Sequence, residues 1–577
     1  MALSLFLCLL VLSYSPSALA QLQFETSAGA SFQLDAKGCV SKYAEKTNYF
    51  PDERRLVATG DATVDGNKGT TSTVTVAKDF SVQYFDTFKV LRNHKDNKTY
   101  VLHQCGTPEI TKDLLPEHAK DAPVFSTPVQ AWSTALTSPL VFLDMLGLNH
   151  LADVVDMTFV TSPCLHRLAK CSSEDEFGHT HIASSVGGLP NPLFKANITE
   201  GDSEVHFIDA WGTGKTESSK DVSFDATSDP GMGRDGTGRA EWVKFVAVFF
   251  NAEPLANTVF DGIQRRLNDV SKLSKGDNAL SKQVAFVAYN AEYKSETNSA
   301  WNSPASWVID NAAYKMDTIK LAGATAYSED KKQSFPNATG VKEALKGVDC
   351  VIDETYAPDP RTYNVTNFLA KFDLELEGAD LSDYPFLANK CVIRLDKRLG
   401  ETKWGVGMDW YESAVGHPDI VVKDLVSLIH DGAVSSDYKT RYMRNIAKGE
   451  VPFVTSPEDC EDPESVCTKA GHDDGHDHDH DHTTTKAMAH SDHDDDHDHD
   501  HDHTTTKAMA HSDHDDDHKH DHDHDHTTTT TAAAKPTTTA AAAAKPTTTT
   551  KTTEKSSSVR VSPFVFVAGA AVVALLQ

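Results

Sequence analysis

Positive charge is scarce in this chain of 577 residues, which has 54 Lys and Arg residues against 84 Asp and Glu residues and a formal net charge of -30 at pH 7. A nucleic-acid-binding surface needs clustered Lys and Arg, and no basic patch occurs here. Catalytic motifs are also lacking, because neither a GxSxG nucleophile elbow nor an HExxH zinc motif is present. We therefore expect no nucleic-acid partner and no enzyme activity.

Two strings look like nucleotide-binding loops but lack the required context. Residues 214–216 read GKT, yet Asp209 stands where a Walker motif has its first glycine. Residues 231–236 have GxGxxG spacing, but turn-forming residues rather than a strand lead into them. We interpret both strings as loops.

Long apolar runs are few, and two of them lie at the ends of the chain. Met1–Ala20 has an apolar run followed by small residues, which predicts a signal peptide cleaved before Gln21. Phe564–Leu576 is too short to span about 30 Å of hydrocarbon comfortably, and small residues precede it, as in a GPI-attachment signal. We predict attachment at Ser556 or Ser557, with a short transmembrane helix as the alternative. The expected location is the secretory pathway and then the cell surface, anchored in the outer leaflet of the plasma membrane.

Cysteines are present in a number that suits disulfides. Removal of the signal peptide leaves an even count of eight, which in a secretory chain predicts paired cysteines. Spacing suggests two local loops and two longer ones, although sequence leaves the connectivity open. The suggested pairs are Cys164 with Cys171, Cys460 with Cys467, Cys39 with Cys105, and Cys350 with Cys391. Four glycosylation sequons, at Asn97, Asn197, Asn337 and Asn364, fit the same compartment.

Histidine and aspartate dominate one segment near the C-terminus. Between His472 and His526 there are 18 His and 19 Asp residues, within two identical copies of TTTKAMAHSDHDDDH. Imidazole and carboxylate are ligands for Zn, Cu and Ni, and the segment has no apolar face with which to fold. With three Lys it carries 16 net negative charges at neutral pH, and protonation of the histidines near pH 6.5 would cancel them.

We call this segment the His/Asp tract and predict that it is disordered, binds metal at neutral pH and releases it in acid. The alternative is a solvated spacer produced by repeat expansion. The predicted metal ligands are His476, His478, His480, His482, His490, His493, His497, His499, His501, His503, His511, His514, His518, His520, His522, His524 and His526.

The body before the tract alternates strand and helix patterns. Val284–Tyr289 and Cys350–Asp353 are apolar nearly throughout, which is typical of strands buried on both faces of a parallel sheet. Apolar residues at helical spacing follow Trp242 and Val422, so the pattern predicts an α/β fold. Residues 239–272 would form one long connecting helix or two, because Pro254 would kink or restart it.

Several ordered segments resemble a known family. They are APVFSTPVQAWSTALTSPLVFLDMLGLNHLADVV (122–155), SFDATSDPGMGRDGTGRAEWVKFVAVFFNAEPLAN (223–257), GVDCVIDETYAPD (347–359) and VGMDWYESAVGHPDIVVKDLVSLIHDG (406–432). Together they resemble the class III substrate-binding proteins of the Fe/B12 periplasmic-binding domain family, which bind ferric siderophores or cobalamin. The resemblance covers roughly residues 80–449 and implies two Rossmann-like α/β lobes joined by a long helix, with a ligand in the cleft between them.

The predicted organisation follows from these patterns. It comprises a signal peptide (1–20), a β-rich extension (21–79), an N-terminal α/β lobe (80–238), a connecting helix (239–273), a C-terminal α/β lobe (274–458), a Cys-containing linker (459–471), the His/Asp tract (472–526), a Thr/Ala/Pro/Lys stalk (527–558) and the GPI-attachment signal (559–577).

The resemblance places ligand contacts in loops at the carboxyl ends of strands, where aromatic residues are frequent. Aromatic rings with a polar edge suit a bulky chelate, and Arg suits negative charge on it. The candidate ligand-binding residues are Trp132, Trp211, Trp301, Trp307, Tyr356, Arg361, Trp410 and Tyr411. The expected ligand is a metal chelate resembling an Fe(III) siderophore, without an intrinsic cofactor.

Two alternatives stay open. The cleft could hold a bare zinc or other transition-metal ion, but the second half of the body offers only His417 and His430 as histidine ligands. From a different class, the chain could be a structural surface glycoprotein that binds nothing. For a receptor, the expected partners are the chelate, the membrane through the anchor, and an uptake permease or an endocytic partner.

Overall fold

The computed structural model describes residues 23–25, 31–50, 55–57, 71–174, 181–183, 203–209, 215–216, 218–229, 236–273, 282–294, 299, 302–327, 332–376, 378–402 and 405–460. The signal peptide, Trp211, Trp301, Asn197, Cys467, the His/Asp tract, the stalk and the GPI-attachment signal lie outside these residues, as does the side chain of Cys171. Within them, no helix combines the length and the apolar composition that a membrane crossing needs.

Two small sheets come first in the chain. The first contains β1 (Gln23–Glu25), β2 (Ser31–Phe32) and β3 (Arg55–Val57) in the order β2-β1-β3. The second contains β4 (Phe80–Tyr84), β5 (Phe88–Asn93), β6 (Lys98–Gln104) and β7 (Val124–Thr127) in sequence order. The first three strands of this second sheet are antiparallel, and β7 joins β6 in parallel.

A five-stranded parallel sheet forms the centre of the first half. Its strands are β8 (Trp132–Thr134), β9 (Ala152–Asp156), β10 (His181–Ala183), β11 (Val205–Ile208) and β12 (Asp221–Ser223), in the order β10-β9-β8-β11-β12. All four pairings are parallel. Its β11 is buried at every position, as expected for a strand covered on both faces. The helices of this half are α2 (Leu140–Met145), α3 (Pro163–Glu174) and α5 (Trp242–Ala247), and α2 and α5 contribute fully buried residues to one apolar core with the sheet.

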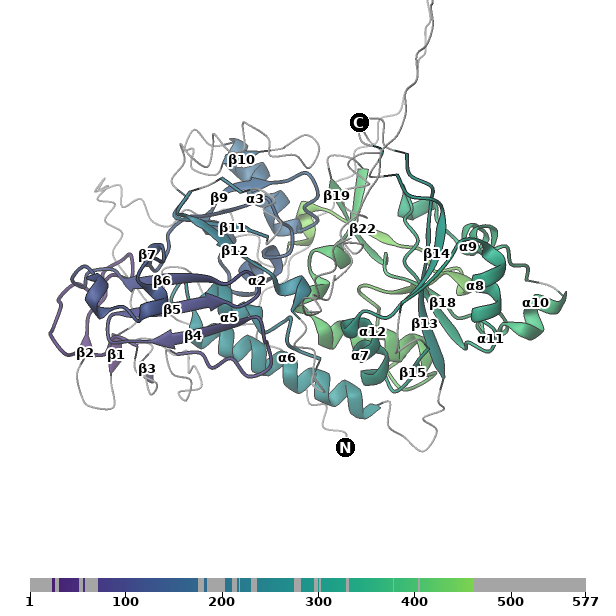
Figure 1. The fold of residues 1–577 in the computed structure, drawn as a ribbon, viewed down its shortest axis with the longest axis horizontal. Helices are drawn as coiled ribbons and strands as arrows, with labels where there is room; N and C mark the ends of the chain where they lie inside the picture. The colour runs from purple at the N-terminus through teal and green to yellow at the C-terminus, as the bar shows by residue number, and fades with distance from the viewer. Residues whose placement is uncertain are drawn as a thin grey trace, which may run out of the picture. The chain divides into compact units, whose positions relative to one another are not determined.

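The connection between the halves is helical but interrupted. Helix α5 ends at Ala247, and a new helix, α6 (Glu253–Leu273), begins after Asn251, whose φ of 53° is left-handed. Pro254 is the second residue of α6, where its missing amide hydrogen costs nothing. Helix α6 contributes Phe260 to the core of the first half and Leu267 to a core of the second half (Figure 1). Pro254 therefore restarts the helix, which is one of the two predicted outcomes.

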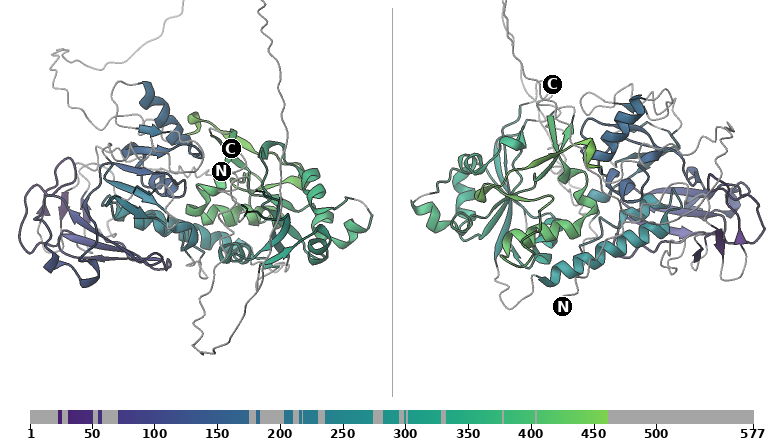
Figure 2. Two further views of the ribbon diagram at one scale, coloured as in Figure 1. Left: turned by 45° about the horizontal axis from the view of Figure 1, so that its top comes forward. Right: turned by 180° about the vertical axis from the view of Figure 1, so that it is seen from behind.

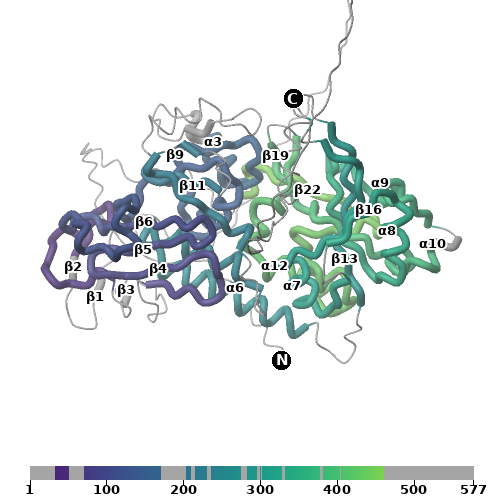
Figure 3. Tube along the Cα trace, viewed as in Figure 1, coloured from purple at the N-terminus to yellow at the C-terminus, as the bar shows by residue number. Residues whose placement is uncertain are grey.

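The second half is built on a mixed seven-stranded sheet. Its strands are β13 (Gln283–Asn290), β14 (Ser306–Asp310), β15 (Thr325–Ala326), β16 (Gln333–Phe335), β17 (Cys350–Asp353), β18 (Val392–Arg394) and β21 (Arg444–Asn445), in the order β16-β14-β13-β17-β18-β21 with β15 beside β13. The central strands β13, β17 and β18 are parallel. The predicted α/β fold class is confirmed, because parallel strands alternate with helices in both halves (Figure 3).

Helices cover both faces of this second sheet. Helices α7 (Ala313–Leu321) and α12 (Pro418–Ile429) pack with α6 into one apolar core. Helices α8 (Ala338–Ala344), α9 (Val365–Phe372) and α11 (Pro385–Ala388) contribute to a second core, and α10 (Gly378–Asp383) precedes α11. A separate sheet of β19 (Arg398–Thr402), β20 (Gly405–Met408) and β22 (Phe453–Thr455) completes this half, in the order β20-β19-β22. Figure 2 shows this half, in green, from two further sides.

Three disulfides link described cysteines. Cys39 bonds to Cys105, and Cys350 bonds to Cys391, as spacing suggested. The suggested local loops are wrong, because Cys164 bonds to Cys460 across 296 residues of sequence. The physical reason is that residues 457–460 fold back onto α3, which brings Cys460 beside Cys164 and into the core of the first half.

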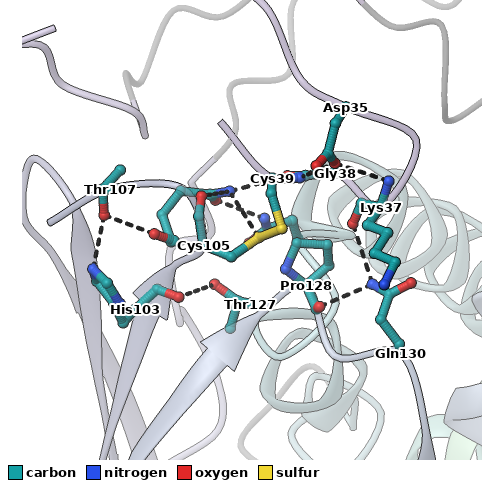
Figure 4. The surroundings of a disulfide bond; sticks show 12 residues. Asp35, Lys37, Gly38, Cys39, His103, Cys105, Thr107, Thr127, Pro128 and Gln130 are labelled. Carbon is teal, nitrogen blue, oxygen red and sulfur yellow. Dashed lines mark hydrogen bonds between the residues drawn. A yellow bond between two sulfur atoms is a disulfide. The ribbon is translucent and has the colours of Figure 1, made fainter. Parts of the chain in front are cut away.

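Close packing holds the Cys39–Cys105 disulfide in place (Figure 4). A carboxylate oxygen of Asp35 accepts hydrogen bonds from the backbone amides of Lys37 and Cys39 at 2.9 Å each, which fixes the turn before the bond. A Cβ atom on Gly106 would lie 2.1 Å from the backbone oxygen of Val40, so a side chain does not fit there. The disulfide therefore joins a tight loop to the end of β6.

Candidate functional site

The carboxyl ends of parallel strands in the two halves lead into segments that contact one another. After β9, residues 157–162 run to Thr161, which meets residues that follow β18 in the second half. After β8, helix α2 places Val141 and Met145 against Gly416, where a Cβ atom would lie 2.9 to 3.1 Å from their side chains. Ligands of open α/β sheets bind beyond the carboxyl ends of the strands. This boundary is therefore the candidate site.

Backbone and carboxylates make the central interlobe contact. The amide of Thr161 donates to a carboxylate oxygen of Glu412 at 2.7 Å, and its hydroxyl donates to Asp409 at 3.3 Å. A Cβ atom on Gly400 would lie 2.6 Å from the Cα and the oxygen of Thr161. Glycine at position 400 thus allows backbone to approach backbone. We call Thr161, Gly400, Asp409 and Glu412 the interlobe contact.

Two neighbouring carboxyl groups in this contact differ in their surroundings. Asp409 has two cationic neighbours, Arg398 at 3.1 Å and Arg441 at 3.8 Å. Glu412 is 3% exposed, and burial together with the negative charge of Asp409 raises its pKa to about 8. Glu412 is therefore mainly protonated at neutral pH.

Buried ion pairs hold the carboxyl ends of β17 and β18 in place. Arg394 donates to Asp353 at 2.9 Å and to Asp396 at 2.6 Å, and Arg444 donates to the other oxygen of Asp396 at 2.5 Å. The Arg394 guanidinium also lies 3.9 Å from the centre of the Tyr363 ring. All four charged side chains are buried. This network fixes the loop after β17, where Arg394 also donates to the Thr355 carbonyl at 3.0 Å.

A second charged group lies where α7 begins. Lys315 forms ion pairs with Asp310, at 2.6 Å, and with Glu354, which directly follows β17. Burial opposes the charge on Lys315, but Glu354 and the other anionic neighbours raise its pKa above its usual range. The guanidinium of Arg239, from the first half, lies 4.2 Å from the centre of the Tyr314 ring on α7. The halves therefore also meet beside α7.

Three exposed aromatic side chains lie on the segments that follow β9, β17 and β20. Phe159 follows β9 and is 38% exposed, Tyr356 follows β17 and is 47% exposed, and Tyr411 follows β20 and is 59% exposed. The backbone oxygen of Phe159 approaches Gly407, two residues before Asp409. Protein atoms around the Tyr411 hydroxyl, and then the charge of Glu354, raise the pKa of Tyr411 to about 12. Tyr411 thus presents an accessible ring and a neutral phenol.

The predicted ligand-binding residues separate into three groups. Tyr356 and Tyr411 are exposed, on the segments after β17 and β20. Trp132 and Trp307 both donate their indole hydrogens to backbone carbonyls: Trp132, which is 0% exposed, donates to Leu148 at 2.7 Å, and the half-buried Trp307 donates to Lys371 at 2.8 Å. Contact of either ring with a ligand stays a prediction.

Trp410 and Arg361, the other two predicted residues that the structure describes, contact side chains of the second half. Trp410 packs against the core beside α12, with its ring centre 6.2 Å from that of Tyr442, and it directly precedes Tyr411. The guanidinium of Arg361 is bound by the carboxylate of Asp359 through contacts of 2.9 and 3.0 Å, so its charge is already paired.

Histidines of the second half cap α12. His417 is the residue before α12, and burial followed by the charges of Arg441, Arg266 and Arg398 lowers its pKa well below its usual range. His430 ends the helix and contacts the Ala322 carbonyl at 2.9 Å through Nε2. In the part of the chain that the structure describes, no group of three or more His, Cys, Asp or Glu side chains is arranged to hold a metal ion.

Sequence reasoning missed Phe159, Thr161, Gly400 and Glu412. Phe159 lies in the loop after β9, and the apolar residues of that strand, with an aromatic residue just beyond them, were a signal that was available. Thr161, Gly400 and Glu412 gave none, because their contact joins positions 251 residues apart in sequence. Of the predicted sequons, Asn97, Asn337 and Asn364 are exposed, and the side-chain oxygens of Asn337 and Asn364 cap α8 and α9.

Comparison with known proteins gave matches among solved structures. No protein-family model matches the chain, and no curated protein does. The petrobactin-binding protein YclQ of Bacillus subtilis is similar at 14% identity and a TM-score of 0.35, over 53% of this chain and 93% of that one. The periplasmic heme-binding protein HutB of Vibrio cholerae is similar at 12% identity and a TM-score of 0.34, over 52% and 99%.

A third similar structure is a possible iron-binding, periplasmic solute-binding protein of Staphylococcus epidermidis, at 11% identity and a TM-score of 0.35, covering 53% of this chain and 100% of that one. In each case nearly the whole solved chain is spanned, whereas about half of this chain is covered.

Proposed function

We propose that this chain is a substrate-binding receptor that captures a bulky metal chelate, resembling a ferric siderophore, at the boundary between its two α/β halves. One observation supports this most directly: the segment after β9 of the first half contacts Glu412, after β20 of the second half, and the exposed rings of Phe159, Tyr356 and Tyr411 lie on the segments after β9, β17 and β20. Rings with an apolar face and a polar edge bind a ligand that offers both hydrocarbon and oxygen atoms.

The charges at the boundary favour an anionic or neutral organic chelate over a bare cation. Two guanidinium groups adjoin the carboxylate of Asp409, with Arg398 at 3.1 Å and Arg441 at 3.8 Å. Glu412 adds no negative charge at neutral pH, because its pKa is about 8. A bare divalent ion instead requires several anionic or imidazole ligands that converge. The resemblance of residues 122–155, 223–257, 347–359 and 406–432 to the class III substrate-binding family supports the same ligand class.

The surroundings of the receptor are part of the proposal. A signal peptide and GPI anchor would place it on the outer surface of the plasma membrane, and the His/Asp tract would raise the local concentration of Zn, Cu or Ni beside it. Captured chelate would pass to an uptake permease or would enter the cell with the receptor by endocytosis. These steps rest on the sequence signals alone.

Tryptophan fluorescence tests the ligand class. The full chain is titrated with a ferric tris-hydroxamate such as ferrichrome, a ferric catecholate, cobalamin, and ZnCl₂. Saturable quenching by one chelate, and its loss in Tyr411→Ala, is the expected result. Saturation by zinc with no response to any chelate would transfer the function to metal-ion binding. No response from folded protein to any ligand would favour the structural glycoprotein.

A further inference from the structure

The chain connects its two halves twice. Helix α6 carries it from the first half to the second, and residues 456–460 carry it back after β22. Strand β22 is paired with β19 in the second half, and the Thr455 hydroxyl also donates to the Leu399 carbonyl at 3.1 Å. The return segment ends at Cys460, which is buried in the core of the first half and bonded to Cys164. We call residues 456–460 the return strap.

The strap is closely fitted at both of its ends. Ser456 and Asp459 form reciprocal hydrogen bonds that start the short helical turn Pro457–Asp459, so five residues cover the distance in a fixed conformation. Cys164 is the second residue of α3 and follows Thr161 by three positions. The disulfide is therefore attached next to the segment that makes the interlobe contact.

We propose that the Cys164–Cys460 disulfide is a covalent staple that holds Thr161 against Gly400, Asp409 and Glu412, so that the two halves stay in contact whether or not ligand is bound. A crosslink acts by limiting the separated states available to the parts it joins. The interlobe contact by itself is small, with two hydrogen bonds and a glycine-sized approach. Because the staple adjoins it, each opening of the contact must be small and brief. This inference goes beyond the proposed function and does not depend on the ligand class.

Disulfide mapping is the first test. Non-reduced peptides of the full secreted chain are identified by mass spectrometry, and a peptide pair that links Cys164 to Cys460 is expected. A bond between Cys164 and Cys171 would overturn the proposal at once.

Hydrogen exchange is the second test. In the full chain, Cys164→Ser with Cys460→Ser is compared with a matched control, Cys39→Ser with Cys105→Ser, which removes a disulfide that does not join the two halves. The Thr161 amide, followed in peptides that cover residues 157–162, should exchange at least ten times faster in the first variant and at the native rate in the control. Equal rates in the two variants would overturn the proposal.

A third variant keeps the test decisive if the double serine variant does not fold. Six Gly and Ser residues are inserted between Thr455 and Ser456. This insertion keeps every cysteine and only lengthens the connection between β22 and Cys460. Faster exchange at Thr161 is again expected, with native protection in β13 and β17 as the check on folding. Unchanged exchange at Thr161 would show that the disulfide does not hold Thr161 in the interlobe contact, and the proposal would fail.

Discussion

The two halves of the molecule place their buried charges differently. In the first half, Glu241 accepts hydrogen bonds from the backbone amides of residues 75–77, and Lys89 pairs with Glu253, so buried charges attach preceding segments to helices. In the second half, Arg394 and Arg444 bind Asp353 and Asp396 at the carboxyl ends of β17 and β18. Buried charges are costly unless they are fully paired. In the second half, the buried ion pairs thus lie at the carboxyl ends of the strands, which is the edge of the sheet that faces the candidate site.

This difference indicates that the two halves contribute differently to the candidate site. Among the described residues, the second half supplies Tyr356 and Tyr411 on loops held by buried ion pairs, while the first half supplies Phe159 and the backbone of Thr161. Orientation of a ligand needs side chains that are fixed before binding. We therefore expect the second half to determine selectivity.

The largest effect should come from breaking a buried network. Arg394→Met removes the ion-pair partner of Asp353 and one of the two arginines that bind Asp396, and it should lower stability by about 3–5 kcal/mol. Lys89→Met should have a similar cost in the first half, because it leaves Glu253 buried and unpaired. Urea unfolding measures both, and chelate titration separates them: only Arg394→Met should weaken binding. Equal loss of binding in the two variants would contradict the expectation that the second half determines selectivity.

Overpacking the interlobe contact should have the next largest effect. In Gly400→Ala the new methyl group meets the backbone of Thr161, which cannot rotate away, and a cost of about 1–3 kcal/mol is expected. The matched control is Gly262→Ala in α6, where the new methyl group lies 3.2 Å from the flexible end of Arg266. Thermal unfolding compares the two, and an equally stable Gly400→Ala protein would contradict the close approach.

Truncating one exposed ring should affect binding without affecting the fold. Tyr411→Ala should weaken chelate affinity about 10-fold or more, since a central aromatic contact commonly contributes over 1 kcal/mol. The control is Tyr43→Ala, an exposed tyrosine in the N-terminal extension. Fluorescence titration measures both affinities. Equal affinities for the two variants would exclude Tyr411 from the site.

Glu412 should make stability depend on pH in a defined direction. Its pKa is raised from 4.5 to about 8 in the folded protein, so the folded state holds more protons than the unfolded state between these values. Its contribution to stability is therefore full below pH 4.5 and is lost as the pH rises through 8. In Glu412→Gln the melting temperature should fall less than in the native protein between pH 5 and pH 9. Parallel pH profiles would refute the assignment.

Removal of the His/Asp tract should have the smallest effect on the body. A chain that ends at residue 471 keeps Cys460 and the staple, so its chelate affinity should match that of the full chain within about twofold. Its capacity for zinc should fall, as measured by isothermal titration at pH 7.5. A chain cut at Glu458 is the informative contrast, because it loses Cys460 and should loosen the interlobe contact.

Local patterns predicted the fold class well and the site only in part. Apolar runs identified β13 and β17, Pro254 identified the start of α6, and spacing suggested two of the three disulfides that join described cysteines. The backbone-carbonyl partners of Trp132 and Trp307 could not be predicted, because a tryptophan next to a strand has the same local pattern whether its indole binds a ligand or a backbone carbonyl. Thr161 and Glu412 meet only through tertiary folding, which no local pattern encodes.

The return strap also determines where mechanical load enters the molecule. A pull on the chain that reaches Cys460 passes through the disulfide to Cys164 and into α3 and the core of the first half. The pairing of β22 with β19 is upstream of that point and is shielded from the load. A receptor held by its C-terminal end would therefore be held through a covalent bond, and traction on the tail would not peel apart the sheet beside the site.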